Sequence, residues 1–298
     1  MELHGTRVLA FGTAGSQGSG LVEALTSRGA HAIRVSSRAD TVDRWRAQGD
    51  DAVLADLQEP GSVDPTLAAA AVLHLPLTLS TPQGVALVVE TVVRLRAAGL
   101  PVAVNIGSPL PPEGAPDMFG SRITAQTLLD AGATVLTPTA YLENHAAPWA
   151  LGPMADGELL YPRPSDSPLS WITARDVTAA GVAALAHDVG PVLLRLAGPQ
   201  VLTFDELAGE LGAGIGRSVA FRRVSADEYG DLLRPFLGDQ AAAGVSAAYG
   251  AMPEGPNPSM VLDAAETWER LGVTPTTARQ WAELVLAPLL AAPTARPA

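Results

Sequence analysis

The sequence predicts an α/β protein with a doubly wound parallel sheet, in which helices cover both faces of the strands. In its first half, short β-branched runs alternate with longer amphipathic runs, which is typical of βαβ units. The short runs are almost continuously apolar, as strands buried on both faces must be. A glycine-rich segment separates the first short run from the first long one. The 298 residues suffice for one large domain or two modest ones.

The elements of the first half follow this alternation in order. Each expected strand is a short apolar run, and each expected helix is a longer run in which apolar and polar residues recur at helical spacing. The strands are expected over 7–11, 32–35, 52–55, 70–75, 101–106 and 134–137. The helices are expected over 20–28, 41–48, 81–98 and 120–131.

Prolines interrupt this pattern after residue 138. Five of them break the chain into a loop, namely Pro148, Pro153, Pro162, Pro164 and Pro168. Strands are then expected over 168–173, 191–196 and 219–224, and helices over 176–187 and 204–212. Thr203 is the expected N-cap of the last helix.

These changes in character divide the chain into two predicted parts. We expect residues 1–137 together with about 168–198 to form the larger α/β domain. Residues of about 138–167 and 199–290 are expected to form a smaller region, and 291–298 a frayed tail.

The composition excludes several kinds of chemistry. The chain has no cysteine, so it has no disulfide, thiolate nucleophile or cysteine-ligated metal. All 19 basic residues are arginines, and without lysine there is no Schiff base, Walker loop or Tyr/Lys dyad. The five histidines show no metal-ligand spacing, so no metal site is expected. A net charge of −12 argues against nucleic acid or an anionic membrane as partner. No signal peptide or membrane-spanning run is recognisable, so a cytoplasmic protein is expected.

The glycine-rich segment carries most of the functional inference. Its glycines have the spacing G-x-x-G-x-x-G and lie between the first strand and the first helix, as a dinucleotide-binding loop requires. One glycine ends the strand in a tight turn, another lets the backbone approach a pyrophosphate, and the third permits close packing of helix on strand. The alternative is an incidental glycine-rich turn. The expected cofactor-binding residues here are Gly12, Thr13, Ala14, Gly15, Ser16, Gln17 and Gly18.

The end of the second strand indicates which dinucleotide is bound. NAD sites usually carry an acidic residue there, but this chain has Ser36, Ser37 and Arg38. Two hydroxyls and a guanidinium suit a 2′-phosphate, which favours NADP (NADPH). The alternative for Arg38 is a solvated arginine at the start of a helix.

Two further strand ends supply cofactor-binding candidates. Asp56 and Leu57 follow the third strand, where the adenine is expected, although Asp56 also suits the start of a helix. His74, Leu75 and Pro76 follow the fourth strand, on the way to the nicotinamide. The alternative for His74 is a purely structural histidine.

Several segments, taken together, are similar to the NmrA-like branch of the atypical short-chain dehydrogenase/reductase superfamily. They are GTAGSQG (12–18), the neighbourhood of Arg38, TPTAYLEN (137–144), WITARDV (171–177) and VLTFDELA (201–208). The resemblance covers roughly residues 7–285 in order. It implies a Rossmann domain that binds NADP and a smaller C-terminal region that closes a cleft over it. The family includes both reductases and cofactor-sensing proteins.

The chain departs from the catalytic pattern of that superfamily. Catalytic relatives carry a Tyr, or a Lys alone, on the helix after strand five, and the pair has the spacing Tyr-x-x-x-Lys. This chain has Met118 and Arg122 at these two positions. Methionine transfers no proton, and arginine, with a pKa above 12, is a poor acid near neutral pH. Arg122 is therefore a candidate catalytic cation that binds ribose hydroxyls or a substrate oxygen, or else a surface arginine.

The expected substrate residues are Ser108, Tyr141, Asn144 and His145. Ser108 follows strand five, where relatives position a substrate, or else it caps a loop. Tyr141 and His145 flank Glu143 and Asn144 at the domain junction, where open α/β sheets bind ligands. Either Tyr141 or His145 could donate a proton, and Tyr141 is the candidate catalytic residue, although such residues also serve as pocket walls or hold a loop.

Two functions are compatible with these residues. One is an NADPH-dependent reductase of a small carbonyl, quinone or enone. The other is a non-catalytic NADP(H)-binding sensor that acts through a protein partner.

Overall fold

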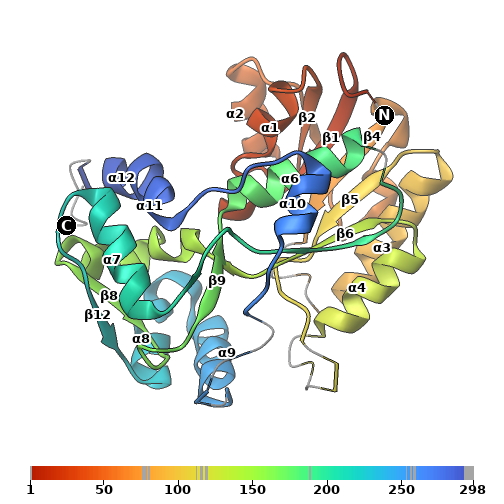
Figure 1. The fold of residues 1–298 in the computed structure, drawn as a ribbon. Helices are drawn as coiled ribbons and strands as arrows, with labels where there is room; N and C mark the ends of the chain where they lie inside the picture. Colours follow the sequence, from red (N-terminus) through yellow and green to blue (C-terminus); the bar gives the residue numbers. More distant parts are fainter. Residues whose placement is uncertain are drawn as a thin grey trace. The chain divides into compact units, whose positions relative to one another are not determined.

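The computed structural model describes residues 2–75, 79, 81–111, 113, 114, 117, 120–187, 189–252, 254, 255, 257 and 260–291 (Figure 1). The chain forms two compact units, each built from three segments. Unit 1 comprises Met1–Pro138, Ala174–Leu196 and Ala264–Thr274, and unit 2 comprises Thr139–Thr173, Ala197–Asp263 and Pro275–Ala298.

Unit 1 contains a seven-stranded sheet in the order β10-β6-β5-β4-β1-β2-β3, and every neighbouring pair is parallel. This confirms the predicted doubly wound sheet. The strands are β1 (Arg7–Phe11), β2 (His31–Ser36), β3 (Ala52–Leu54), β4 (Ala70–His74), β5 (Val102–Asn105), β6 (Thr134–Pro138) and β10 (Leu193–Leu196).

Helices cover both faces of this sheet (Figure 1). On one face, α3 (Pro82–Ala97) and α4 (Ser121–Asp130) pack on the side chains of Leu9 and Ile33. On the other, α1 (Leu21–Thr26) and α6 (Ala174–Ala186) pack on Val8 and Ala10. The strands are apolar on both sides because both sides are buried. The remaining helical segments are α2 (Ala39–Ala47), α10 (Ala265–Leu271), η1 (Ser16–Gly18), η2 (Pro60–Ser62) and η3 (Pro65–Leu67).

The strand order reverses the direction of chain winding at a defined point of the sheet. β1 pairs with β2 on one side and with β4 on the other, so the direction of chain winding reverses between β1 and β4. In open parallel sheets, ligands bind outside the carboxyl ends of the strands at such a reversal. In unit 1 this edge carries Gly12 after β1 and His74 at the end of β4.

Unit 2 has smaller sheets around a separate apolar core. β9 pairs with β7 and β11, and β12 pairs with β8. Trp171, Phe204 and Trp281 are among the buried residues of its core. Its strands are β7 (Ala140–Tyr141), β8 (Glu158–Tyr161), β9 (Leu169–Ile172), β11 (Val201–Leu202) and β12 (Ala220–Arg223). Its helical segments are η5 (Leu142–His145), α5 (Pro148–Ala155), α7 (Phe204–Ile215), α8 (Ala226–Leu237), α9 (Asp239–Gly250), α11 (Ala278–Trp281), the π-helix η6 (Ala282–Leu286) and α12 (Ala287–Ala291).

The loop predicted from the five prolines is wrong over its first part, where α5 and β8 form. Pro148 is tolerated because it occupies the first turn of α5, where a backbone N–H has no intrahelical partner. Pro153 lies inside the helix and forgoes one hydrogen bond, but the neighbouring Met154 is buried at 1% exposure and holds the segment against the core. Tertiary packing therefore overrides the local effect of proline here.

Two segments lie in other units than the sequence suggested. The strand expected over 168–173 forms as β9 in unit 2, where its partners β7 and β11 lie. Residues 264–274, expected in the smaller region, belong to unit 1, where α10 packs on α6 and β10. Strand pairing and helix packing, which composition does not reveal, decide these boundaries.

The expected N-cap of the helix that begins at Phe204 is confirmed. Thr203 accepts a hydrogen bond from the Glu206 N–H, and the Glu206 carboxylate accepts one from the Thr203 N–H. None of the helices in the described ranges has both the length and the apolar character needed to cross a bilayer.

Candidate functional site

The glycine loop after β1 is closed by a very close backbone contact. A Cβ at Gly18 would lie 2.3 Å from the Gly12 carbonyl oxygen, so position 18 admits no side chain. Gly12 has a φ of +80°, and a Cβ there would lie 3.0 Å from the His74 Cβ. Both glycines are therefore required by the loop itself.

Gly15 differs from the other two glycines of the motif. Its φ of −93° and ψ of 162° are extended values that any residue adopts. A Cβ there would have a single neighbour within 4 Å among the described residues, the Gly12 carbonyl oxygen at 3.5 Å. The fold of the loop therefore has room for a side chain at position 15, and the backbone there is open to a ligand.

Arg34 holds the glycine loop from the neighbouring strand, a role that the sequence analysis missed. Its Nε donates to Thr13 Oγ1 at 3.3 Å, and its Nη1 is 2.5 Å from Asp50 Oδ2. Its Cζ lies 3.8 Å above the Trp45 ring, a cation–π contact. The signal that could have found it is a charged residue among the apolar residues Ala32, Ile33 and Val35 of the second strand.

The end of β2 places Arg38 at the surface. Ser36 Oγ accepts a hydrogen bond from the Arg38 N–H at 3.1 Å, which shapes the turn. The Arg38 guanidinium donates from Nε and Nη2 to the two Asp40 oxygens at 3.2 and 2.8 Å. These hydrogen bonds hold the pKa of Asp40 below its ordinary value. The two side chains are 73% and 62% exposed, so water competes for both, and the pair is weak.

The segment after β3 is folded tightly on itself. Asp56 Oδ1 accepts from the Gln58 N–H at 2.8 Å, and the Asp56 N–H donates to Ser62 Oγ at 2.9 Å. Leu57 is buried at 7% exposure in the core of unit 1. Asp56 thus shapes this turn, and the Leu57 side chain packs inward. A cavity of about 30 Å³ lies next to this turn. Its lining includes Phe11, Val35, Leu54, Ser62 and Val63.

At the ends of β4 and β5, a buried polar pair faces the glycine loop. His74 Nδ1 and Asn105 Nδ2 are 2.9 Å apart, and Asn105 Oδ1 accepts from the Gly107 N–H at 2.9 Å. Burial lowers the pKa of His74 to about 4. Leu75 is buried, and its N–H donates to the Asn105 carbonyl. Pro76 lies outside the described residues.

The loop and the end of β5 also meet through Gln17. A Cβ at Gly107 would lie 3.0 Å from the Gln17 Oε1, so the Gln17 side chain rests against Gly107. The predicted residues of the glycine loop and of the fourth and fifth strand ends are therefore neighbours at one edge of the sheet.

The start of α4 shows where Ser108 and Arg122 lie. Ser108 Oγ is 2.8 Å from Ser121 Oγ. The Asp117 carboxylate accepts from the Ser121 and Arg122 N–H groups at 2.9 Å each, and so caps the helix. The Arg122 guanidinium donates to the Pro111 carbonyl at 3.2 Å and is exposed. Met118, the other position of the missing dyad, lies outside the described residues.

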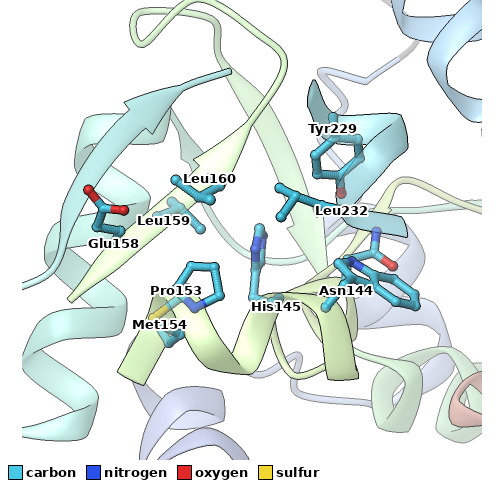
Figure 2. A pocket seen from close by; sticks show the side chains of 11 residues that line it. Asn144, His145, Pro153, Met154, Glu158, Leu159, Leu160, Tyr229 and Leu232 are labelled. Carbon is cyan, nitrogen blue, oxygen red and sulfur yellow. The ribbon is translucent and has the colours of Figure 1, made fainter. Parts of the chain in front are cut away.

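The remaining expected substrate residues lie in unit 2. Tyr141 is 5% exposed and lies in β7, opposite Ile172 of β9. Asn144 and His145 line a pocket with Trp149 and Tyr229, and Figure 2 shows the His145 ring in its middle. Its volume is about 10 Å³, room for about one water molecule. A substrate ring does not fit this pocket as it stands.

His145 is buried among aromatic rings and is uncharged near neutral pH. Its ring centroid lies 4.9 Å from that of Trp171 and 6.0 Å from that of Tyr161. Burial lowers the pKa of His145 to about 3. Neighbouring Glu143 has a structural contact, since its Oε1 accepts from the Trp281 Nε1–H at 3.2 Å. A neutral imidazole is not the proton source that the sequence allowed at position 145.

The burial of His145 predicts a pH-dependent stability. The imidazole of the unfolded chain protonates near pH 6.5, whereas that of the folded chain does so near pH 3. Between these values the unfolded state binds more protons, so the free energy of unfolding falls as the pH drops. By pH 5 the loss for one such histidine is about 2 kcal/mol. His145→Phe should therefore melt with a smaller loss in Tm between pH 7 and pH 5 than the wild type.

His31→Phe serves as the matched control, because His31 is exposed on β2. This variant should keep the full pH dependence of the wild type. Equal Tm losses in His145→Phe and His31→Phe would contradict the assignment of a neutral, buried His145.

Comparison with known proteins shows what the fold resembles. No protein-family model matches the sequence, and no curated protein matches it significantly. Triphenylmethane reductase of Citrobacter sp., solved with NADP(H), has a TM-score of 0.74 at 16% identity over 94% of this chain and 99% of its own. An NADPH-dependent quinone oxidoreductase of Escherichia coli, solved with NADPH, has a TM-score of 0.71 at 18% identity, with the same coverage of both chains.

A mutant of NmrA is also similar in structure, with a TM-score of 0.63 at 16% identity over 95% of each chain. These likenesses confirm the predicted resemblance at the level of the fold. The chain therefore shares the Rossmann fold of these solved structures.

Proposed function

We propose that unit 1 binds NADP(H) at the carboxyl edge of its seven-stranded sheet. The observation that carries this proposal is Gly15, where the loop has room for a side chain and the sequence has none. Close approach of a pyrophosphate to the backbone explains such a glycine. The buried His74 beside the loop, whose Nε2 has no hydrogen-bond partner among the described residues, also fits a bound ligand. Two proteins of similar fold were solved with this cofactor, which supports the proposal.

NADP is the expected form because of the residues at the end of β2. Ser36, Ser37 and Arg38 offer two hydroxyls and a guanidinium, and no carboxylate precedes Asp40 in this turn. Arg38 is engaged with Asp40, but the pair is exposed and weak. A 2′-phosphate dianion can therefore displace the Asp40 carboxylate, since charge-assisted hydrogen bonds to phosphate are strong.

The proposed activity is the NADPH-dependent reduction of a small carbonyl, quinone or enone. The bound dinucleotide would supply the hydride. The glycine loop, Arg38 and the strand-end residues would bind and orient it. Arginine is a poor general acid, so Arg122 would act at most as a positioning cation. With His145 neutral, the Tyr141 hydroxyl or solvent is left to supply the proton, which suits strongly polarised substrates that need little acid catalysis.

A second candidate is a non-catalytic sensor of NADP(H) that acts through a protein partner. It is favoured by Arg122, which stands at the lysine position of the catalytic dyad and donates to the Pro111 carbonyl. A sensor requires the two redox forms of the cofactor to prefer different conformations, because equal affinity shifts no equilibrium.

Substitution of Gly15 tests the cofactor site. Gly15→Val should weaken NADP binding at least a hundredfold, because the side chain occupies the approach of the pyrophosphate, while Tm stays close to that of the wild type. Isothermal titration calorimetry and thermal melting measure the two effects. Gly18→Ala is the matched contrast, since its Cβ meets the Gly12 carbonyl and should lower Tm. Normal NADP binding by a folded Gly15→Val variant would rule out this loop.

Substitution of Arg38 tests the choice of dinucleotide. Arg38→Ala should weaken NADP binding about ten- to a hundredfold, which corresponds to about 1.5–3 kcal/mol for a charge-assisted hydrogen bond. NAD binding should change little, because NAD lacks the 2′-phosphate. Asp40→Asn removes the competing carboxylate, so its NADP affinity should equal or exceed that of the wild type. Parallel losses for NADP and NAD in Arg38→Ala would contradict the assignment.

Turnover separates the reductase from the sensor. NADPH oxidation in the presence of a panel of quinones and enones should exceed a blank without protein. Tyr141→Phe should lower kcat by about 10²–10⁴ with little change in NADPH affinity, because a general acid acts only in the reaction. A fall of less than tenfold would assign the proton to solvent. Absence of turnover, together with different protease-digestion patterns for the NADPH and NADP⁺ complexes, would favour the sensor.

A further inference from the structure

A buried polar pair lies where the winding of the unit 1 sheet reverses. His74 ends β4 and Asn105 ends β5, and the two residues are register partners in neighbouring strands. Their side chains meet at 2.9 Å between His74 Nδ1 and Asn105 Nδ2. His74 is 4% exposed and Asn105 is fully buried. Both side chains therefore depend on protein or ligand groups for their hydrogen bonds.

Asn105 determines which nitrogen of His74 carries the proton. The Gly107 backbone N–H lies 2.9 Å from the Asn105 side chain, and a backbone N–H can only donate. The atom that faces Gly107 is therefore the amide oxygen, so the amide NH₂ faces His74. An NH₂ group can only donate as well, so His74 Nδ1 is the acceptor. A neutral imidazole with an accepting Nδ1 carries its single proton on Nε2.

The imidazole stays neutral at physiological pH, so this tautomer is the relevant one. Burial lowers the pKa of His74 to about 4. Protonation would also place an Nδ1–H against the Asn105 NH₂, with two donors facing each other. His74 is therefore a neutral donor through Nε2–H and not a source of protons near pH 7.

The Nε2–H group of His74 is buried without a hydrogen-bond partner among the described residues. An unpaired buried donor is unfavourable, and such groups in folded proteins call for an explanation. The position of the imidazole beside the glycine loop offers an explanation for this unpaired donor. A Cβ at Gly12 would lie 3.0 Å from His74 Cβ and 3.7 Å from the ring atom Cδ2. The donor is thus held next to the loop proposed to bind the dinucleotide.

We propose that His74 donates its Nε2–H hydrogen bond to an oxygen of the bound pyridine dinucleotide, with Asn105 holding the ring in the donating tautomer. The inference rests on the proposed function and adds a positioning residue to it. Phosphate, ribose and carboxamide oxygens are acceptors of the required kind. Outside the adenosine 2′-phosphate, NADP and NAD have the same atoms, so the hydrogen bond should serve both equally. In this respect His74 differs from Arg38, which is expected to read the 2′-phosphate alone.

Paired affinities for the two dinucleotides test the proposal. His74→Phe keeps the ring volume but lacks the donor, and it should weaken NADP⁺ and NAD⁺ by the same factor, about five- to tenfold. Arg38→Ala is the matched control, in which NADP⁺ alone weakens. His74→Gln restores an N–H donor and should recover part of the lost affinity for both dinucleotides. Unchanged affinities in a folded His74→Phe variant would overturn the proposal.

Imidazole ¹⁵N NMR of the wild-type chain tests the tautomer without a substitution in the site. The His74 signals, assigned by their loss in His74→Gln, should show a protonated Nε2 and an unprotonated Nδ1 at pH 7. Addition of NADP⁺ should shift the Nε2–H proton downfield as its hydrogen bond forms. A protonated Nδ1, or an Nε2–H resonance that NADP⁺ leaves unmoved, would refute the inference even if His74→Phe did not fold.

These experiments distinguish failure of the His74 proposal from failure of the proposed NADP(H) site. If Gly15→Val abolishes NADP binding and His74→Phe leaves it unchanged, the cofactor site stands and the role of His74 falls. If wild-type protein binds neither dinucleotide, both fall. If dinucleotide affinities are unchanged but the KM of a substrate rises in His74→Phe, the donor serves the substrate, and the inference is wrong.

Discussion

The contact between Gly18 and the Gly12 carbonyl is the constraint on which the carboxyl edge of the unit 1 sheet depends. A methyl group at position 18 would overlap the carbonyl oxygen at 2.3 Å, so the loop closes to backbone contact. This closure keeps the loop directly over the end of β1. Arg34 reaches Thr13 from β2, and Gln17 rests against Gly107 after β5. A wider loop would break both connections and remove the open backbone at Gly15.

Because the chain has no lysine, the basic side chains at the carboxyl edge of the unit 1 sheet are arginines. Arg34 is enclosed between Asp50 and the Trp45 ring and serves the loop, whereas Arg38 is exposed with Asp40. Arginine keeps its charge at every physiological pH and therefore binds but does not transfer protons. The buried His74 and His145 are neutral for the opposite reason, since burial disfavours their charged form. Neither histidine is therefore a source of protons near pH 7, and under the proposed function the proton would come from a hydroxyl or from solvent.

Local patterns predicted the sheet well because parallel strands are buried on both faces. The apolar runs at 7–11 and 70–75 formed β1 and β4 with at most one residue of difference at either end. The same reasoning failed over 148–161, where prolines suggested a loop but a helix and a strand formed. Proline disfavours a helix or strand only through the local backbone. Met154 and Leu159 are buried in the core of unit 2, and this packing stabilises the segment in spite of its prolines.

The sequence by itself determined the alternation of strands and helices, the glycine spacing of the loop and the exclusion of cysteine and lysine chemistry. These features depend on neighbouring residues or on composition alone, so periodicity and counting suffice for them. Only the tertiary structure decided that Arg34 holds Thr13 and that Asn105, 31 residues from His74 in sequence, sets its tautomer. It also decided that Arg122 donates to the Pro111 carbonyl and that His145 is neutral. The physical reason is that hydrogen-bond partners and burial are set by strand order and packing, which join residues that no local pattern relates.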